Sequence, residues 1–168
     1  MVTKESMKRG KKKGILCSPL KLRPADIEKG GFSRADLVFH GVDHSGISYE
    51  VRVFLNNPDA SEKTPRSKEH GYAGRFVIFG HGGCYGSEGH CDLPTQSKGQ
   101  FDLRRPHPLT PQTKLLPVTE PLRRILEQDS KGLDSVTLVP ISQNPLREDR
   151  RLTDKLFKFT GMELRTYR

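Results

Sequence analysis

The sequence predicts a mainly β protein: an antiparallel β-sandwich of about six to seven strands with one short helix and long loops. Turn-forming residues are abundant, with 16 glycines and 12 prolines among 168 residues, and only 33% of the residues are hydrophobic. Segments typical of strands recur along the chain, whereas a helical pattern occurs once. The length is typical of a single domain with a buried core.

The clearest strand pattern lies at residues 47–55, ISYEVRVFL. Apolar residues at every second position predict one face buried in the core. The residues of this face are Ile47, Tyr49, Val51, Val53 and Leu55. Residues 34–42, RADLVFHGV, are a second predicted strand, and the intervening DHSG is typical of a tight turn. We therefore predict that the two strands form a hairpin.

The third predicted strand is YAGRFVIFGH at residues 72–81, whose apolar run is dense enough for a central position in a sheet. Residues 56–71, rich in charges and turn formers, are predicted to be a mobile surface loop. A longer irregular stretch follows at residues 82–113. A loop of that length in a compact domain is usually functional or disordered.

The single helical pattern covers residues 118–132, VTEPLRRILEQDSKG. Thr119 is predicted as its N-cap and Gly132 as its end. Leu122, Ile125 and Leu126 fall on one face at helical spacing. A further strand is predicted at residues 133–141, and one or two closing strands at residues 155–168.

Residues 1–24 are predicted to form a basic, flexible arm, and residues 25–168 the sandwich domain. The formal net charge is +9, and six of the first thirteen residues are Lys or Arg. Basic arms of this kind bind nucleic acid or acidic partners. No aromatic residue is interleaved with these charges to stack on a base, which favours a solvated tail over a nucleic-acid partner.

The N-terminal residues have no pattern of a targeting segment. The basic start is not followed by the apolar region and cleavage site of a signal peptide. No apolar run has the length of a membrane span, so we expect no membrane partner. Three cysteines, an odd number, fit a reducing compartment better than a disulfide scaffold. These observations predict a cytoplasmic protein.

The order of the segments resembles the C-terminal β-sandwich domain of type 3 copper proteins, as found in molluscan haemocyanins, tyrosinases and polyphenol oxidases. The resemblance is carried by YEVRVFLN, then YAGRFVIFGH, a variable loop, PVTEPLRRIL and SVTLVPIS. It covers roughly residues 35–142 and is a similarity of pattern and not of a unique signature.

The resemblance implies an accessory role. In this family the domain lies over the dicopper centre, inserts a blocking side chain, and shields or matures the copper site. It implies a copper oxidase catalytic subunit as the partner. The oxidase centre itself needs six histidines displayed by helices, whereas the six histidines here lie in predicted strands and loops: His40, His44, His70, His81, His90 and His107. We therefore expect no catalytic residues in the chain, and no position matches the blocking residue.

A glycine-rich segment after the third predicted strand, FGHGGCYGSEGHCDLP at residues 79–94, contains two cysteines and two histidines. Thiolate and imidazole suit Cu(I) or Zn(II), and the glycines allow a tight backbone around a small ion. The predicted metal ligands are Cys84, His90, Cys91 and His81, with copper as the first candidate and zinc as the alternative. The spacing matches no standard zinc pattern. A Cys84–Cys91 disulfide and a loop without chemistry stay open as alternatives.

Two functions follow from these observations. The first is a non-catalytic accessory or lid-type subunit that shields or matures a partner's copper site and itself binds copper. The alternative is a stand-alone binding module, stabilised by a metal or a disulfide, whose basic arm binds an acidic partner or nucleic acid. A hydrolase or oxidoreductase that uses the same loop is the least favoured, because adjacent loop residues such as Ser87, Glu88 and His90 rarely orient as a catalytic set.

Overall fold

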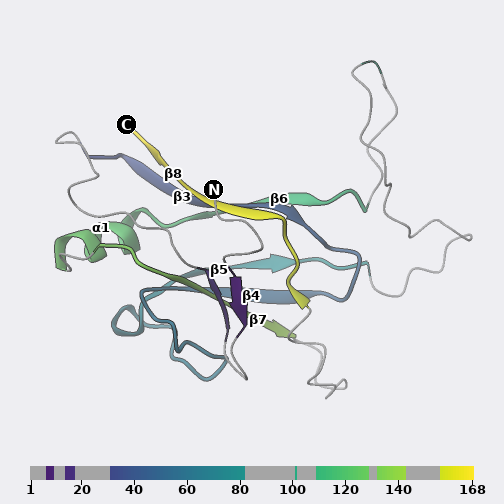
Figure 1. Ribbon diagram of the computed structural model, residues 1–168, viewed down its shortest axis with the longest axis horizontal. Helices are drawn as coiled ribbons and strands as arrows, with labels where there is room; N and C mark the ends of the chain where they lie inside the picture. The colour runs from purple at the N-terminus through teal and green to yellow at the C-terminus, as the bar shows by residue number, and fades with distance from the viewer. Residues whose placement is uncertain are drawn as a thin grey trace, which may run out of the picture.

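The computed structural model describes residues 7–9, 14–17, 31–81, 101, 109–128, 132–142 and 156–168. Within these residues, eight β-strands form two antiparallel sheets that pack against each other (Figure 1). One sheet has five strands in the order β1-β2-β7-β4-β5, and the other has three strands in the order β6-β3-β8. The predicted mainly β, antiparallel architecture with one short helix is confirmed.

The elements have the following bounds. The five-stranded sheet contains Met7–Arg9 (β1), Ile15–Cys17 (β2), Val136–Ser142 (β7), Tyr49–Leu55 (β4) and Tyr72–Ile78 (β5). The three-stranded sheet contains Gln112–Pro117 (β6), Arg34–Val42 (β3) and Gly161–Tyr167 (β8). The α-helix is Thr119–Gln128 (α1), and a short 3-10 helix covers Lys68–His70.

The main hydrophobic core lies between the two sheets. The predicted inner face of β4 is confirmed for Tyr49, Val51, Val53 and Leu55, which are all buried in this core. Ile47 lies before the strand and is half-buried, and Glu50 and Phe54 on the other face are buried as well, so burial does not alternate along β4.

Phe39 of β3 lies opposite the inner face of β4, and its ring centroid is within 5.9 Å of those of three other phenylalanines. These partners are Phe76 of β5 and Phe157 and Phe159, which precede β8.

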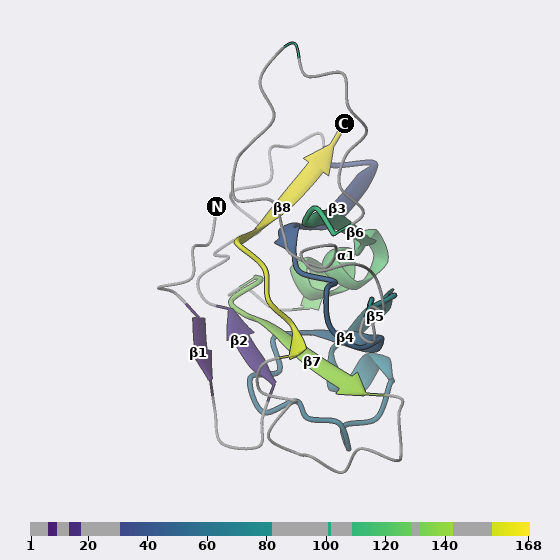
Figure 2. The same ribbon diagram turned by 90° about the vertical axis from the view of Figure 1, so that its right-hand side faces the viewer.

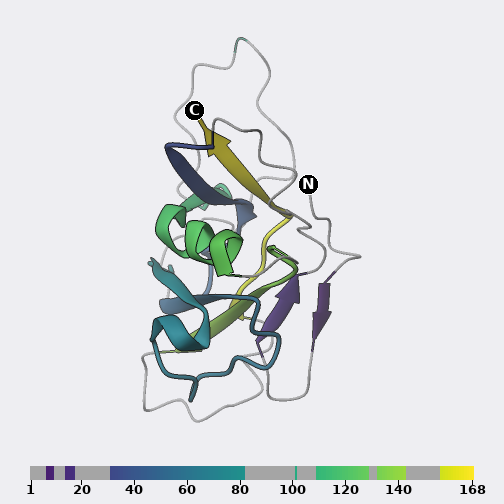
Figure 3. The same ribbon diagram turned by 90° about the vertical axis from the view of Figure 1, so that its left-hand side faces the viewer.

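Helix α1 lies along one side of the sandwich, between the levels of the two sheets (Figure 3). Leu122 is fully buried, and Ile125 and Leu126 pack against the main core. This is the face that the helical spacing predicted. The helix therefore covers core residues that the two sheets alone leave open.

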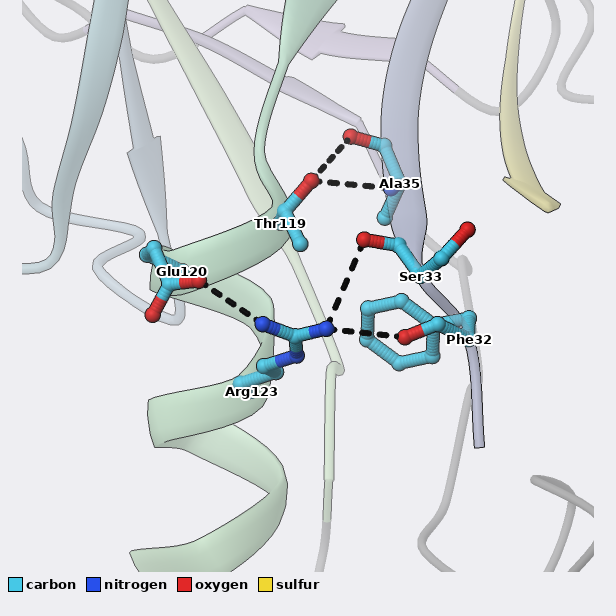
Figure 4. Close-up of polar contacts among 6 residues, drawn as sticks. All are labelled: Phe32, Ser33, Ala35, Thr119, Glu120 and Arg123. Atoms are coloured by element: carbon cyan, nitrogen blue, oxygen red, sulfur yellow. Dashed lines mark hydrogen bonds and ion pairs between the residues drawn. The ribbon is translucent and has the colours of Figure 1, made fainter. Parts of the chain in front are cut away.

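Figure 4 shows how the start of α1 is attached to the start of β3. Thr119 Oγ1 accepts a hydrogen bond from the Ala35 amide at 3.0 Å, so this hydroxyl, predicted to cap the helix, bonds to β3. The Arg123 guanidinium donates to the Phe32 carbonyl at 3.0 Å and to the Glu120 carboxylate at 2.8 Å. The contacts with Ala35 and Phe32 attach the first turns of the helix to the beginning of β3 and the residues before it.

The predicted hairpin of residues 34–42 and 47–55 is wrong. β3 pairs with β6 and β8, whereas β4 pairs with β5 and β7, so the turn between them crosses from one sheet to the other. Gly41, with a φ of 60°, lies at an irregularity in the pairing of β3 with β6, where the strand departs from regular pairing before the turn. Both strands still direct an apolar face into the same core, which is why their patterns are alike.

β5 and β6 also differ from expectation. β5 lies at the edge of the described sheet and not at a central position, and it pairs there with β4. β6 begins at Gln112, inside the stretch that was predicted to be irregular. Apolar and polar residues do not alternate in the sequence of β6. Its two adjacent leucines face opposite sides of the sheet, since Leu115 is 44% exposed and Leu116 is buried.

Residues 56–71, predicted to be a mobile surface loop, pack on the outer face of the five-stranded sheet. Ala60 is buried there in a second apolar cluster with Phe54 of β4. Thr137 Oγ1 of β7 donates a hydrogen bond to the Asn57 carbonyl at 2.7 Å. This segment therefore covers part of the sheet and shields the outward-facing side chains of β4.

The predicted boundary between an arm and the sandwich at residue 24 is wrong for the residues described before it. Ile15 and Cys17 of β2 are 7% and 0% exposed and belong to the main core. β2 pairs with β7, and β1 pairs with β2 at the edge of the same sheet (Figure 2). A strand of three residues contains too few alternations to be recognised beside a run of lysines.

Candidate functional site

Two histidine side chains meet beside the end of β5. In Figure 1, β5 points away from α1. His44 lies in the turn between β3 and β4, and His81 follows the end of β5. Their Nδ1 atoms are 3.2 Å apart, and the rings are tilted by 70° with centroids 5.0 Å apart. Two nitrogens at this distance are within hydrogen-bonding range of each other.

The pairing of β4 with β5 brings the two histidines together. Tyr49 is paired with Ile78, so the turn before β4 lies beside the residues after β5. The His81 amide donates to the His44 carbonyl at 3.0 Å. Gly80 lies directly against this turn, and a Cβ there would collide with the Gly46 and Ile47 carbonyls. The close approach therefore requires glycine at position 80.

His44 is held in one orientation. Its residue is only 1% exposed, and Nε2 lies 3.0 Å from the carbonyl oxygen of Thr110, just before β6. A carbonyl only accepts hydrogen bonds, so Nε2 carries a proton. In the neutral ring the lone pair is then on Nδ1, directed at His81. His81 itself is exposed.

Both carboxylate oxygens of Asp43, the residue next to His44, already have partners. Its Oδ1 accepts hydrogen bonds from the Ser45 amide at 2.9 Å and hydroxyl at 2.6 Å, and Oδ2 lies 3.4 Å from Lys158 Nζ. Burial raises the pKa of Asp43, but the Ser45 hydrogen bonds and the Lys158 charge outweigh it and lower the pKa below its usual value. This carboxylate stabilises the turn that carries His44.

Of the four predicted metal ligands, His81 is in the described part of the chain. Cys84, His90 and Cys91 lie outside the described residues. Among the described residues, no group of three or more His, Cys, Asp or Glu side chains is arranged to hold a metal ion. Sequence spacing does not point to His44, because its contact with His81 joins residues 37 positions apart.

The third cysteine, Cys17, lies in β2 and is fully buried and free. Burial raises the pKa of its thiol to about 12, so the thiol stays protonated at neutral pH. Since the thiolate is the metal-binding form, Cys17 is a core residue and not a ligand.

A second group of charged side chains lies on the outer face of the five-stranded sheet. Glu50 is 3% exposed, Arg52 Nε donates to its carboxylate at 2.7 Å, and Arg75 forms a short ion pair with its other oxygen. Burial raises the pKa of Glu50, but the hydrogen bonds and charges of the two arginines outweigh it and lower the pKa below its usual value. Both carboxylate oxygens are occupied, so this group is structural.

Glu50→Gln is expected to lower the free energy of unfolding at pH 7 by about 2 kcal/mol, as is typical for hydrogen bonds to a charged group. The native pKa of Glu50 is depressed, so its ion pairs stabilise the fold above the unfolded-state pKa of about 4.3. This contribution disappears as the pH falls through the lower native pKa. Urea unfolding of the wild-type and Glu50→Gln proteins from about pH 7 to pH 3 measures the difference between their free energies of unfolding. A difference that stays constant over this range would show that the ion pairs of Glu50 do not stabilise the fold.

Comparison of the chain with protein-family models, with curated protein sequences and with solved structures gave no significant match. The similarity to type 3 copper C-terminal domains therefore stays a prediction from the order of segments. None of the helices in the described part of the chain has the length and apolar character needed to cross a membrane.

Proposed function

We propose that this chain is a non-catalytic β-sandwich module that binds one copper or zinc ion at the end of β5 and serves a type 3 copper oxidase as an accessory subunit. The observation that supports metal binding is the contact of His81 Nδ1 with a second imidazole nitrogen, 3.2 Å away. This contact lies at the start of the glycine-rich segment of residues 79–94, which also contains Cys84, His90 and Cys91.

The proposed ligands are His81, Cys84, His90 and Cys91. Thiolates and imidazoles together suit Cu(I) and Zn(II), the softer of the common ions. The cysteines must be reduced to bind metal, so the proposal requires a reducing compartment such as the cytoplasm. His81 is held by its backbone hydrogen bond to His44.

The reduced protein is expected to bind about one equivalent of Cu(I) or Zn(II) per chain. Binding should release protons and weaken as the pH falls, because the thiols must lose their protons to become ligands. Cys84→Ser and Cys91→Ser should each abolish binding. Equilibrium dialysis followed by elemental analysis measures the stoichiometry.

Cys17→Ser is the matched control, because Cys17 is buried in β2 and should leave the metal stoichiometry unchanged. Stoichiometric metal in the double variant Cys84→Ser, Cys91→Ser would contradict the thiolate ligands. The disulfide alternative predicts instead that the oxidised protein binds no metal and that reductant lowers its melting temperature.

The accessory role is supported by the order of the segments and by the sandwich architecture. It is tested by expressing a type 3 copper oxidase of the same organism with and without this chain. The copper content and activity of the oxidase should rise with the chain present, and should rise less with Cys84→Ser, Cys91→Ser. An unchanged copper content would contradict the accessory role and favour the stand-alone binding module.

A further inference from the structure

We propose that His44 is a metal ligand, and that His44 and His81 hold the ion jointly through their Nδ1 atoms. This inference rests on the proposed metal-binding function and places His44, 37 residues before His81, among the four ligands of a tetrahedral ion, in the place of His90. It also assigns the coordinating atom of each ring. The histidine half of the site is then built by the fold itself, from the turn before β4 and the residues after β5.

The distance between the two nitrogens fits a shared ion. With metal–nitrogen distances of about 2.0–2.1 Å and tetrahedral angles, two imidazole nitrogens on one Zn(II) are about 3.3–3.4 Å apart. The observed Nδ1–Nδ1 distance is 3.2 Å. An ion between the rings therefore requires only a small outward movement of His81, whose residue is exposed.

The hydrogen bond made by the other ring nitrogen of His44 is also typical of a metal site. A histidine that binds a metal through one nitrogen usually donates the other N–H to a carbonyl or a carboxylate, which fixes the ring and the tautomer. His44 Nε2 donates to the Thr110 carbonyl at 3.0 Å in this way. The ring is thus fixed from the segment before β6, with the Nδ1 lone pair directed at His81.

Without metal, the same geometry is a hydrogen bond in which His81 Nδ1–H donates to His44 Nδ1. Metal binding replaces this shared proton, and the neutral His81 ring then carries its proton on Nε2. His44 keeps its proton on Nε2 in both states. The two rings therefore respond differently, and this difference can be observed in each ring separately.

The test uses the reduced full-length protein with Zn(II) as the probe, and long-range 1H–15N NMR of the histidine rings. We expect the Nδ1 resonances of both His44 and His81 to shift at one equivalent of zinc. His44→Gln and His81→Gln should each weaken zinc binding at least about 100-fold, since even an outer partner of a metal-bound histidine contributes about 10- to 100-fold. His70→Gln, in the 3-10 helix, is the control and should leave the affinity unchanged.

The outcomes separate this inference from the proposed function. If zinc binds while the His44 Nδ1 resonance stays unshifted, the inference is wrong and the thiolate site stands. If Cys84→Ser, Cys91→Ser still binds zinc with both Nδ1 resonances shifted, the histidine pair stands and the thiolate ligands are wrong. If the reduced wild-type protein binds neither zinc nor Cu(I), both are wrong. The NMR result on the wild-type protein holds even if His44→Gln fails to fold.

Discussion

Val51→Asp should abolish cooperative folding of the chain. Val51 is fully buried in the core between the sheets, where it pairs with Phe76 of β5 and Pro140 of β7. An unpaired carboxylate at such a position costs several kcal/mol, in addition to the lost apolar burial. The expected loss of free energy of unfolding approaches the total stability of a typical domain, about 5–15 kcal/mol. Circular dichroism during thermal unfolding measures it.

Leu115→Asp in β6 is the matched control, because it introduces the same charge at an apolar strand residue that is 44% exposed. It should change the free energy of unfolding by no more than about 1 kcal/mol. If Val51→Asp unfolds at the same temperature as Leu115→Asp, the core described for β4 is wrong.

Deletion of residues 1–17 should destabilise the domain by about 4 kcal/mol, because it removes the buried side chains of Ile15 and Cys17. It also leaves the β7 edge without its hydrogen-bonded partner β2. Edge exposure of this kind promotes association between chains. Thermal unfolding together with light scattering measures both effects.

Deletion of residues 1–13 is the comparison, because among the described residues it removes only β1. Its melting temperature should fall by no more than about 5 °C, which corresponds to the order of 1 kcal/mol for a domain of this size. Equal melting temperatures of the two deletion variants would show that β2 adds nothing to the core.

The parts of the fold that were predicted correctly depend on short-range patterns. The alternation from Tyr49 to Leu55 identifies β4 because each residue reports which face it occupies. The spacing of Leu122, Ile125 and Leu126 identifies the buried face of α1 for the same reason. These signals are contained within one element and do not depend on its neighbours.

The parts that were missed depend on which elements are neighbours in space. The turn DHSG is compatible with a hairpin and with a crossing between sheets, and only the pairing of β3 with β6 and β8 decides between them. Ile15 and Cys17 look like part of a basic arm until Val136 and Leu138 of β7 are placed beside them.

The candidate site also depends partly on a signal within one segment and partly on a contact between distant residues. His81 was predicted from its position in a cysteine- and glycine-rich segment, which is a local signal. His44 could not be selected, because its role depends on the Nδ1–Nδ1 contact with His81 and on the Thr110 carbonyl. Gly80 was a local hint, since only glycine allows the backbone to approach the turn that carries His44.

We propose that thiolate and imidazole ligands hold one ion at the end of β5, and X-ray absorption spectroscopy of the zinc-loaded, reduced protein can identify these ligands. We expect a first shell that contains both sulfur at about 2.3 Å and nitrogen at about 2.0–2.1 Å. The sulfur signal should disappear in Cys84→Ser, Cys91→Ser. A first shell of oxygen and nitrogen alone in the wild-type protein would show that the thiolates are not ligands.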